Sequence, residues 1–510
     1  MLRPYKKQKE NKHMSTRKSM KFRKEEAFGR ELSKRGYSRR QILRLGALLG
    51  MSGAALAACA APPATAPKAA DAPAAAPTEK PAEAAPVASL FDSAEGANAA
   101  WPKSSVAEPA AKVTLAVAHA WDATFYERQK QFDALFMQRH PNIEIKGENT
   151  AWGDLRQKYL TLAAGGALPD ISYIHFSWAQ QMIKAGLLKS LDDYIAAEKD
   201  FKLEDFFPAS LPSYQRDGKL WVVPYDEGPM ILYYNKDLFD KAGVAYPSDA
   251  WTLDDMKAAA LKITGGEGPN KVFGLGSSPN AGDSTMSPTW LAPFGGSYVN
   301  EPDETKCNLN SPESIGALEY WHELRTKGAV PAPADTQGLS WPAFQHGRIA
   351  MWVDGTWATP PIQAGSKFKW DMAKFPKGPK AHVMASAGSG YGITRDSKAA
   401  DAAWIYLNDY LSTAGQAYMW GITGRGSPAR LSAWPSYLGS KFAPAGAKNA
   451  QEELAGLAKH DILDQPATAE VTQAAGAIWD QVVAGTLSVK DAANQICAAI
   501  DPLLAKNAVK

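Results

Sequence analysis

Several of the sixteen tryptophans in this 510-residue chain stand close to a carboxylate. The pairs are Trp121 with Asp122, Trp152 with Asp154, and Trp352 with Asp354, which Trp357 follows closely. An indole face can cover the apolar C–H face of a sugar ring, while a carboxylate accepts hydrogen bonds from the ring's hydroxyls. Aromatic faces and negative charge also suit a cation. The pattern therefore favours capture of a carbohydrate, with a cationic solute such as a polyamine as the alternative.

The motifs of common hydrolases and of metal or phosphate sites are absent from the sequence. It has no G-x-S-x-G elbow and no P-loop, and His322-Glu323 lacks the second histidine of a zinc H-E-x-x-H motif. The eight histidines are scattered along the chain. We therefore expect a protein that is not an enzyme and that holds no metal and no cofactor. An exported glycoside hydrolase stays a rival because it needs only two carboxylates, and a structural surface lipoprotein is a third reading.

Alternating strands and helices are expected to position the aromatic and acidic residues. Short β-rich runs, each followed by a segment of helical spacing, occupy residues 113–118, 143–145 and 171–174. Such alternation predicts a parallel sheet covered by helices, with ligands beyond the carboxyl ends of the strands. Trp121, Asp122, Trp152 and His175 would then lie on loops at one common edge.

The extreme N-terminus differs from the rest of the chain. Residues 1–44 contain sixteen basic residues and four acids, whereas the whole chain carries a net charge of +3, so the remainder is acidic. This balance argues against a nucleic-acid partner. An uncharged run follows at residues 45–58, and Arg39 and Arg40 precede it in a twin-arginine pattern. Residues 1–58 are thus predicted to be a twin-arginine signal peptide, with general secretion as the alternative and Met14 or Met20 as possible starts.

Cys59 ends the segment Leu-Ala-Ala-Cys, which resembles a bacterial lipobox. In such a motif the cysteine is lipidated and becomes the first mature residue, and acyl chains hold the protein at the membrane. Residues 59–110 are dominated by Ala and Pro, which predicts a disordered tether. We therefore expect an exported protein, lipid-anchored at the outer face of the cell membrane.

Two further cysteines, Cys307 and Cys497, would share this export compartment, where a disulfide can persist. Nearly two hundred residues separate them. We expect two independent, small core residues, and whether they pair stays open.

The order of motifs from residue 112 to the C-terminus resembles family 1 of the extracellular solute-binding proteins, the group that includes maltose-binding protein. The segments that carry the resemblance are residues 163–170, 185–192, 218–224, 232–247, 251–252, 344–357, 390–404 and 424–428. The resemblance implies an α/β, type II-like periplasmic-binding-protein fold with two lobes. Each lobe would hold a mixed sheet flanked by helices, and hinge strands would join them. It also implies a monomeric receptor that delivers its solute to the permease subunits of an ABC importer.

By analogy with the family, residues 111–226 plus 385–424 form the N-terminal lobe, and residues 229–384 plus 427–510 form the C-terminal lobe. Trp357 aligns with a family tryptophan that stacks on sugar. The other candidates for ligand binding are Trp121, Asp122, Trp152, Asp226, Glu227, Trp290, Trp352, Asp354, Tyr391 and Arg425. The sequence around Asp226 departs from that of maltose-binding protein, so maltose itself is not inferred. The identity, length and linkage of the sugar stay open.

Other residues are expected to serve folding alone. Thr252 and Asp255 resemble a helix capping box. Strand alternation should point Tyr233 and Tyr234 to opposite faces, which argues against a shared ferric-iron site. The tryptophans expected in the core are Trp221, Trp321 and Trp404.

Overall fold

The computed structural model describes residues 100–277, 287–300, 304–337, 339, 342–456, 458–460 and 468–507. The chain divides into two units, Met1–Glu83 and Ala84–Lys510, and every described residue belongs to the second unit. The predicted signal peptide with Arg39 and Arg40, the predicted lipidation site Cys59, and the tether up to residue 99 lie outside the described residues.

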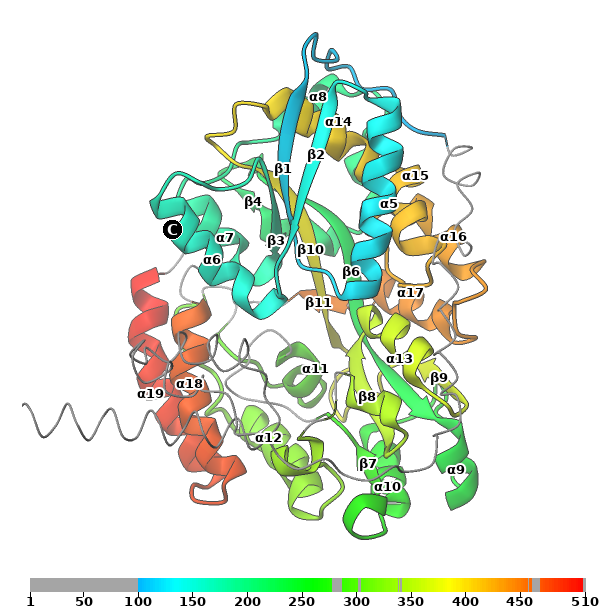
Figure 1. Cartoon of the computed structure of the whole chain (residues 1–510). Helices are drawn as coiled ribbons and strands as arrows, with labels where there is room; N and C mark the ends of the chain where they lie inside the picture. Colours follow the sequence, from blue (N-terminus) through cyan, green and yellow to red (C-terminus); the bar gives the residue numbers. More distant parts are fainter. Residues whose placement is uncertain are drawn as a thin grey trace, which may run out of the picture. The chain divides into compact units, whose positions relative to one another are not determined.

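The first lobe is built on three parallel strands. Strand β1 (Val113–His119) pairs with β2 (Ile143–Asn149) on one side and with β3 (Ile171–His175) on the other. A helix follows each strand, namely α5 (Ala123–Arg139), α6 (Trp152–Ala164) and α7 (Phe176–Lys184) (Figure 1). The lobe is completed by α8 (Asp192–Ala197), α14 (Ala400–Tyr410) and α15 (Thr413–Gln416). The alternation predicted from the sequence is thus present, and one large hydrophobic core fills this lobe.

Two long antiparallel strands, β6 (Val223–Asn235) and β10 (Met384–Ile393), join the two lobes and form the first and second crossings between them (Figure 1). The sheet order is β2-β1-β3-β10-β6-β8-β7, so β10 contacts the first lobe through β3, and β6 contacts the second through β8. A third crossing lies at residues 424–428, where the Glu227 N–H donates to the Ser427 carbonyl at 3.0 Å. Gly424, Gly426 and Ser427 all have positive φ there, so the chain turns sharply.

The second lobe extends the sheet with β8 (Ile349–Gly355), β7 (Phe273–Leu275) and β9 (Trp370–Ala373). Its helices are α9 (Lys236–Ala242), α10 (Leu253–Ile263), α11 (Ser287–Leu291), α12 (Pro312–Thr326), α13 (Thr359–Gly365), α16 (Trp434–Leu438), α17 (Ala447–Gly456), α18 (Thr468–Val483) and α19 (Val489–Asn507). A short strand, β11 (Ala458–His460), pairs with β10. The two-lobed, mixed α/β fold predicted from the sequence is therefore confirmed.

Local signals in the sequence account for several element boundaries. The Thr252 hydroxyl accepts from the Asp255 N–H at 3.2 Å, and the Asp255 carboxylate accepts from the Thr252 N–H at 2.9 Å. This is the predicted capping box, and it begins α10. Tyr233 and Tyr234 pack in two different hydrophobic clusters, so the predicted alternation along β6 is also confirmed.

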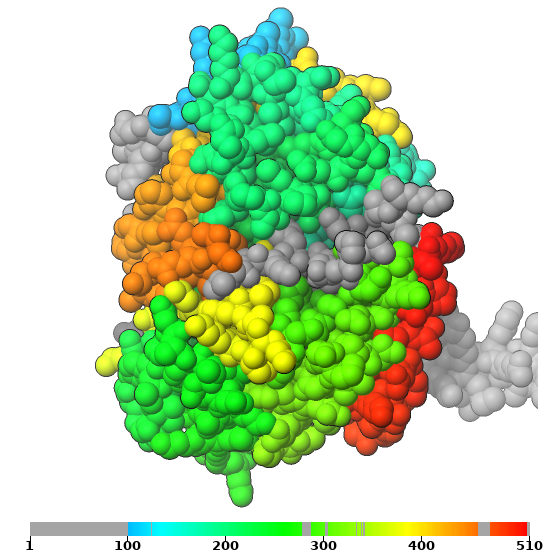
Figure 2. Space-filling model, turned by 180° about the vertical axis from the view of Figure 1, so that it is seen from behind, coloured from blue at the N-terminus to red at the C-terminus, as the bar shows by residue number. Residues whose placement is uncertain are grey.

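Cys307 and Cys497 form a disulfide, so the expectation of two independent core residues is wrong. Cys497 lies on α19, which packs with α18 and α12. Figure 2 shows the red C-terminal segment lying against green residues of the second lobe. The Cys307 N–H also donates to the Asp501 carboxylate at 2.7 Å. Pairing across 190 residues depends on how helices pack in three dimensions, which residue spacing does not reveal.

Residues 101–109, which the sequence predicts as the end of the tether, pack on the first lobe instead. We call them the arm. The Trp101 ring lies 3.8 Å from the Arg139 guanidinium and meets the Phe132 ring edge-on at 5.8 Å. The Ser104 hydroxyl donates to the Glu198 carboxylate at 2.5 Å. One tryptophan and a few polar contacts thus order a segment whose Ala/Pro-rich neighbourhood predicts disorder.

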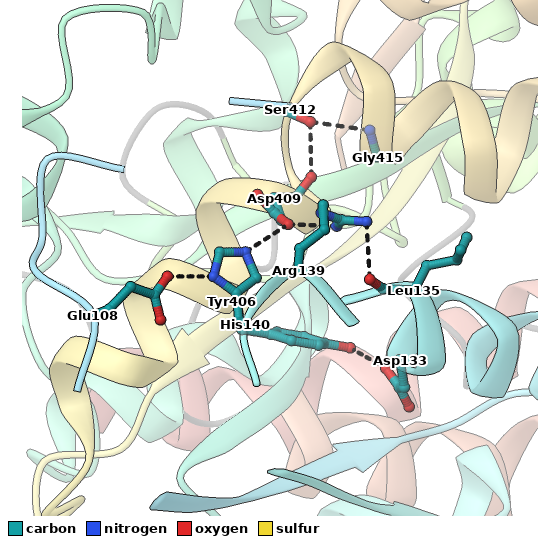
Figure 3. Close-up of polar contacts among 9 residues, drawn as sticks. All are labelled: Glu108, Asp133, Leu135, Arg139, His140, Tyr406, Asp409, Ser412 and Gly415. Atoms are coloured by element: carbon teal, nitrogen blue, oxygen red, sulfur yellow. Dashed lines mark hydrogen bonds and ion pairs between the residues drawn. The ribbon is translucent and has the colours of Figure 1, made fainter. Parts of the chain in front are cut away.

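The arm is also joined to the lobe through His140, which contacts two carboxylates (Figure 3). One ring nitrogen contacts Glu108 of the arm, and the other lies 3.3 Å from the Asp409 carboxylate, which accepts from Arg139 at 2.5 Å. Burial lowers the pKa of His140, but the hydrogen bonds to Asp409 and Glu108 outweigh burial and raise it above its ordinary value. A protonated His140 therefore stabilises the arm on the lobe.

Candidate functional site

A cavity of about 730 Å³ lies between the two lobes beside the crossing strands. We call it the cleft. Its described lining residues are Ala120, Trp121, Asp122, Ala151, Trp152, Tyr173, His175, Asp226, Met230, Asp354, Trp357, Ala387, Gly388, Ser389 and Arg425. Seven of the eleven ligand-binding candidates predicted from the sequence are therefore brought together: Trp121, Asp122, Trp152, Asp226, Asp354, Trp357 and Arg425.

Trp121 and Asp122 stand where β1 ends and α5 begins. The Trp121 backbone is held on both sides by Asn149 of β2, whose amide accepts from the Trp121 N–H and donates to the Trp121 carbonyl, each at 2.8 Å. Asp122 is the N-cap of α5 and accepts from the Phe125 N–H at 3.0 Å. The two residues reach the cleft because the strand ends there, as the sheet predicts.

Arg425 comes from the third crossing and pairs with Asp122 at 2.7 Å. Its guanidinium also lies over the Phe125 ring, 4.1 Å from the ring centroid. Since residues 122 and 425 belong to distant parts of the sequence, this pair ties the third crossing to the start of α5. It also places one positive charge at the edge of the cleft.

The side of the cleft formed by α6 and β3 is aromatic. Trp152, the first residue of α6, is 49% exposed, which is high for so large a side chain. Its indole meets the His175 ring edge-on at 5.2 Å. Tyr173 lies deeper on β3, and its hydroxyl accepts from the Ser389 hydroxyl at 2.8 Å. An exposed indole above a polar floor suits a ligand with both apolar and hydroxyl-bearing faces.

Asp226 lies on β6 at the first crossing and is half-buried. Its carboxylate accepts from the Ser389 N–H of β10 at 2.8 Å. Burial raises the pKa of Asp226 to about 7, although the Ser389 N–H and the positive charge of Arg425 oppose this shift. The acid at the centre of the cleft thus changes its charge near neutral pH.

Trp357 forms the wall contributed by the second lobe. Its ring lies against two glycines: a Cβ on Gly355 would overlap the ring, and one on Gly228 would come within 3.0 Å of it. The half-buried indole packs against the cores of both lobes. The adjacent Asp354 is 9% exposed and accepts from the Trp352 indole N–H at 3.0 Å.

Four predicted candidates do not line the cleft as far as the described residues define it. Glu227 follows Asp226 on β6, and strand alternation turns it to the other face, where it is fully buried. Trp352 and Trp290 pack in the second lobe, and the Trp290 ring meets Trp321 edge-on. Tyr391 is buried in the first lobe, where its hydroxyl lies 2.6 Å from the His119 ring.

Three further lining residues, Tyr173, Met230 and Ser389, were not among the candidates, because none of them belongs to the pattern of tryptophans beside acids. Their position was the available signal, because Met230 and Ser389 lie within a few residues of the predicted lobe boundaries at residues 226–229 and 384–385, where strands leave one lobe for the other. His175 was placed at the correct edge but was not chosen as a ligand-binding residue.

Among the described residues, no group of His, Cys, Asp and Glu side chains is suited to hold a metal ion. In the same part of the chain, no helix is long and apolar enough to cross a membrane.

Comparison with known proteins shows consistent similarities. A family model for bacterial extracellular solute-binding proteins matches residues 118–417. A binding protein of Brucella abortus is 28% identical over 335 residues, which cover 63% of this chain and 74% of the relative. The lactose-binding protein of Rhizobium radiobacter is 25% identical over 342 residues, covering 64% of this chain and 76% of that protein. The solved structure of an ABC substrate-binding protein from Listeria monocytogenes in complex with cycloalternan superposes with a TM-score of 0.69 at 26% identity, covering 77% of this chain and 99% of that one.

Proposed function

Since the chain belongs to the bacterial extracellular solute-binding protein family, we propose that its cleft binds a mono- or oligosaccharide and that the protein delivers this sugar to an ABC importer. The observation that carries the proposal is the lining of the cleft. Three tryptophans from both lobes face the same cavity as three carboxylates. Indole faces cover sugar rings while acids accept from sugar hydroxyls. The lactose-binding relative and the cycloalternan-bound structure support the same class of ligand.

The charges of the cleft favour a neutral solute over a polyamine. Asp122 is paired with Arg425, so its negative charge is largely compensated. The raised pKa of Asp226 leaves part of that group uncharged at pH 7. A polyamine needs uncompensated negative charge in addition to aromatic faces. The third carboxylate, Asp354, is 9% exposed and accepts from the Trp352 indole N–H and the Gly355 N–H, so its charge is partly taken up by these donors. The cleft therefore offers aromatic faces with a weak negative field, which suits a carbohydrate better.

A thermal-shift screen tests the proposal. The protein from Ala60 onward would be mixed with lactose, maltotriose, cyclic glucans and monosaccharides, with spermidine as the cationic comparison. A sugar at 100 times its dissociation constant should stabilise the protein by about 2.7 kcal/mol. Stabilisation by spermidine alone would replace the sugar proposal with the cationic one. No shift with any solute would favour a purely structural lipoprotein.

A hydrolase needs a separate test because an acid with a pKa near 7 would also suit general acid catalysis. We propose that the protein releases its solute unchanged. The sugar that gives the largest thermal shift would be incubated with the protein and analysed by chromatography. Appearance of cleavage products that depends on Asp226, and is lost in Asp226→Asn, would establish a glycosidase instead.

We further propose that the protein is exported by the twin-arginine route, anchored through lipidated Cys59 and active as a monomer. Cys59→Ser should move the protein from the membrane fraction to the soluble fraction. Changing Arg39 and Arg40 together to Lys should retain the precursor inside the cell. Persistence of Cys59→Ser on membranes, or normal export of the double variant, would contradict these assignments.

A further inference from the structure

Trp121 forms part of the first-lobe wall of the cleft, and a network of buried polar side chains lies directly behind it. The Trp121 side chain is only 6% exposed, and its indole N–H donates to the side-chain oxygen of Gln129 at 3.2 Å. Gln129 lies on α5, eight residues after Trp121, and is fully buried. The indole N–H is the only polar group of a tryptophan, and it can only donate. Trp121 therefore directs its single donor into the lobe and presents hydrocarbon to the cleft.

The Gln129 amide is held in one orientation by four hydrogen bonds. Its oxygen accepts from Trp121 and from the Tyr410 hydroxyl at 2.9 Å. Its nitrogen donates to the Asp133 carboxylate at 2.9 Å and to the Tyr406 hydroxyl at 2.8 Å. Turning the amide over would set its N–H groups against the indole N–H, which cannot accept. The network therefore fixes which end of Gln129 faces Trp121.

The far side of this network is anchored as well. The Tyr406 hydroxyl donates to the Asp133 carboxylate at 2.8 Å (Figure 3). Tyr406 and Tyr410 both lie on α14, whereas Asp133 and Gln129 lie on α5. Two helices thus hold Gln129, and through it they hold the indole. A buried, fully bonded network of this kind gives its members a single arrangement.

We propose that Gln129 is a positioning residue of the cleft, which fixes the Trp121 indole in the orientation that receives the solute and withholds its N–H from the solute. The part of this proposal that concerns affinity rests on the sugar-binding function proposed above. It implies that the Trp121 wall selects an apolar ring face rather than a hydroxyl. Hydrogen bonds to the solute must then come from other groups of the cleft.

The orientation of Trp121 can be followed without any solute. In protein carrying ¹⁵N-labelled tryptophan, the indole N–H signal of Trp121 is identified by its loss in Trp121→Phe. Gln129→Leu should change the chemical shift of that signal and increase its hydrogen exchange with water by about tenfold, because a buried hydrogen bond is lost. Gln129→Met, which keeps the side-chain length, serves as a second variant should the leucine variant fold poorly.

Gln180→Leu is the matched control. Gln180 is a buried glutamine of the same lobe, whose amide donates to the carbonyls of Ser213 at 3.1 Å and Gln215 at 3.0 Å. Its replacement should lower stability without moving the Trp121 signal. An unchanged Trp121 signal in folded Gln129→Leu or Gln129→Met would overturn the proposal.

Affinity is measured with lactose and maltotriose as probes. Gln129→Leu should weaken the binding of the probe that binds wild type by about tenfold, and Gln180→Leu should not. In the Trp121→Phe background, where no indole N–H remains, Gln129→Leu should have little further effect. A shifted indole signal with unchanged affinity would contradict positioning for binding. If neither probe binds wild type, the sugar proposal fails for these probes, while the exchange measurement still decides whether Gln129 orients Trp121.

Discussion

Replacing Trp357 with Ala is the most direct perturbation of the proposed cleft. The indole is half-buried and forms the second-lobe wall of the cavity, at the end of β8. Truncation removes the ring without introducing charge or a new polar group. The expected result is a large loss of sugar affinity with a smaller loss of stability.

The size of the effect follows from the surface that the ring offers. A solute that covers one indole face removes about 80–100 Å² of apolar surface from water, and at about 25 cal/mol per Å² this is worth about 2 kcal/mol. The dissociation constant should therefore rise about thirtyfold in Trp357→Ala. Because the ring also packs against the cores of both lobes, some loss of melting temperature is expected too.

A glycine substitution can displace the same ring without removing it. Gly355 has φ of −74° and ψ of 166°, a backbone conformation that alanine adopts freely. A Cβ at this position would nevertheless overlap the Trp357 ring. Gly355→Ala should therefore weaken sugar binding in wild type. In the Trp357→Ala background it should have almost no effect, because the ring it displaces is gone.

Affinities would be measured by isothermal titration calorimetry with the sugar that gives the largest thermal shift. Trp404→Ala is the control, since Trp404 is fully buried in the first lobe and donates to Glu198 at 3.0 Å. That variant should lose about 3–5 kcal/mol of stability while its folded fraction keeps wild-type affinity. Unchanged affinity in Trp357→Ala, or additive effects of the Gly355 and Trp357 substitutions, would refute the placement of the ring against the solute.

Three further outcomes are expected. Replacing Cys307 and Cys497 together with Ser should cost about 2–5 kcal/mol in the free energy of unfolding, and reductant should have no further effect on the variant's melting temperature. Glu198→Gln should loosen the arm, since this carboxylate accepts from the Ser104 hydroxyl, and limited proteolysis read by mass spectrometry should show faster cleavage within residues 101–109. Burial raises the pKa of Asp133 to about 7 from an ordinary value near 3.8, so its contribution to stability is present below pH 4 and is lost as pH rises through 7. Asp133→Asn should accordingly show a smaller fall in melting temperature between pH 5 and pH 8, and an equal fall would contradict the assignment.

The sequence predicted the parts of the cleft that depend on where strands end. Trp121 and Asp122 follow β1, and Asp354 and Trp357 lie at the end of β8. Residues at such positions are carried to the edge of a sheet whatever the details of packing. For this reason, the pattern of tryptophans beside acids located lining residues of the cleft in both lobes.

The candidates that do not line the cleft differ from the lining residues in their depth and in the direction of their side chains. Tyr391 lies two residues beyond Ser389 on β10, and a strand rises by about 3.3 Å per residue, so Tyr391 sits about 7 Å further along the strand. There it is enclosed by the first core, beside His119. Glu227 does not line the cleft because of its direction, since adjacent strand residues point to opposite faces and Asp226 faces the cleft. Residue types do not reveal depth along a strand, but the strand alternation that separated Tyr233 from Tyr234 could also have separated Glu227 from Asp226.

The surroundings of Trp357 link the proposed binding wall to the hinge. The ring packs against Gly228 at the first crossing, and the preceding Thr356 hydrogen-bonds through its hydroxyl to Ser427 at the third crossing.

Ser427 itself holds a φ of 25°, a backbone conformation that few residues other than glycine adopt. Any rotation of one lobe against the other about these crossings must therefore alter the packing of Thr356 and Trp357. Trp357 also lines the cleft. A bound solute and a change in the angle between the lobes therefore both affect the packing of this side chain. A solute that contacts Trp357 better at one lobe angle than at another shifts the population of lobe angles by that difference in binding free energy.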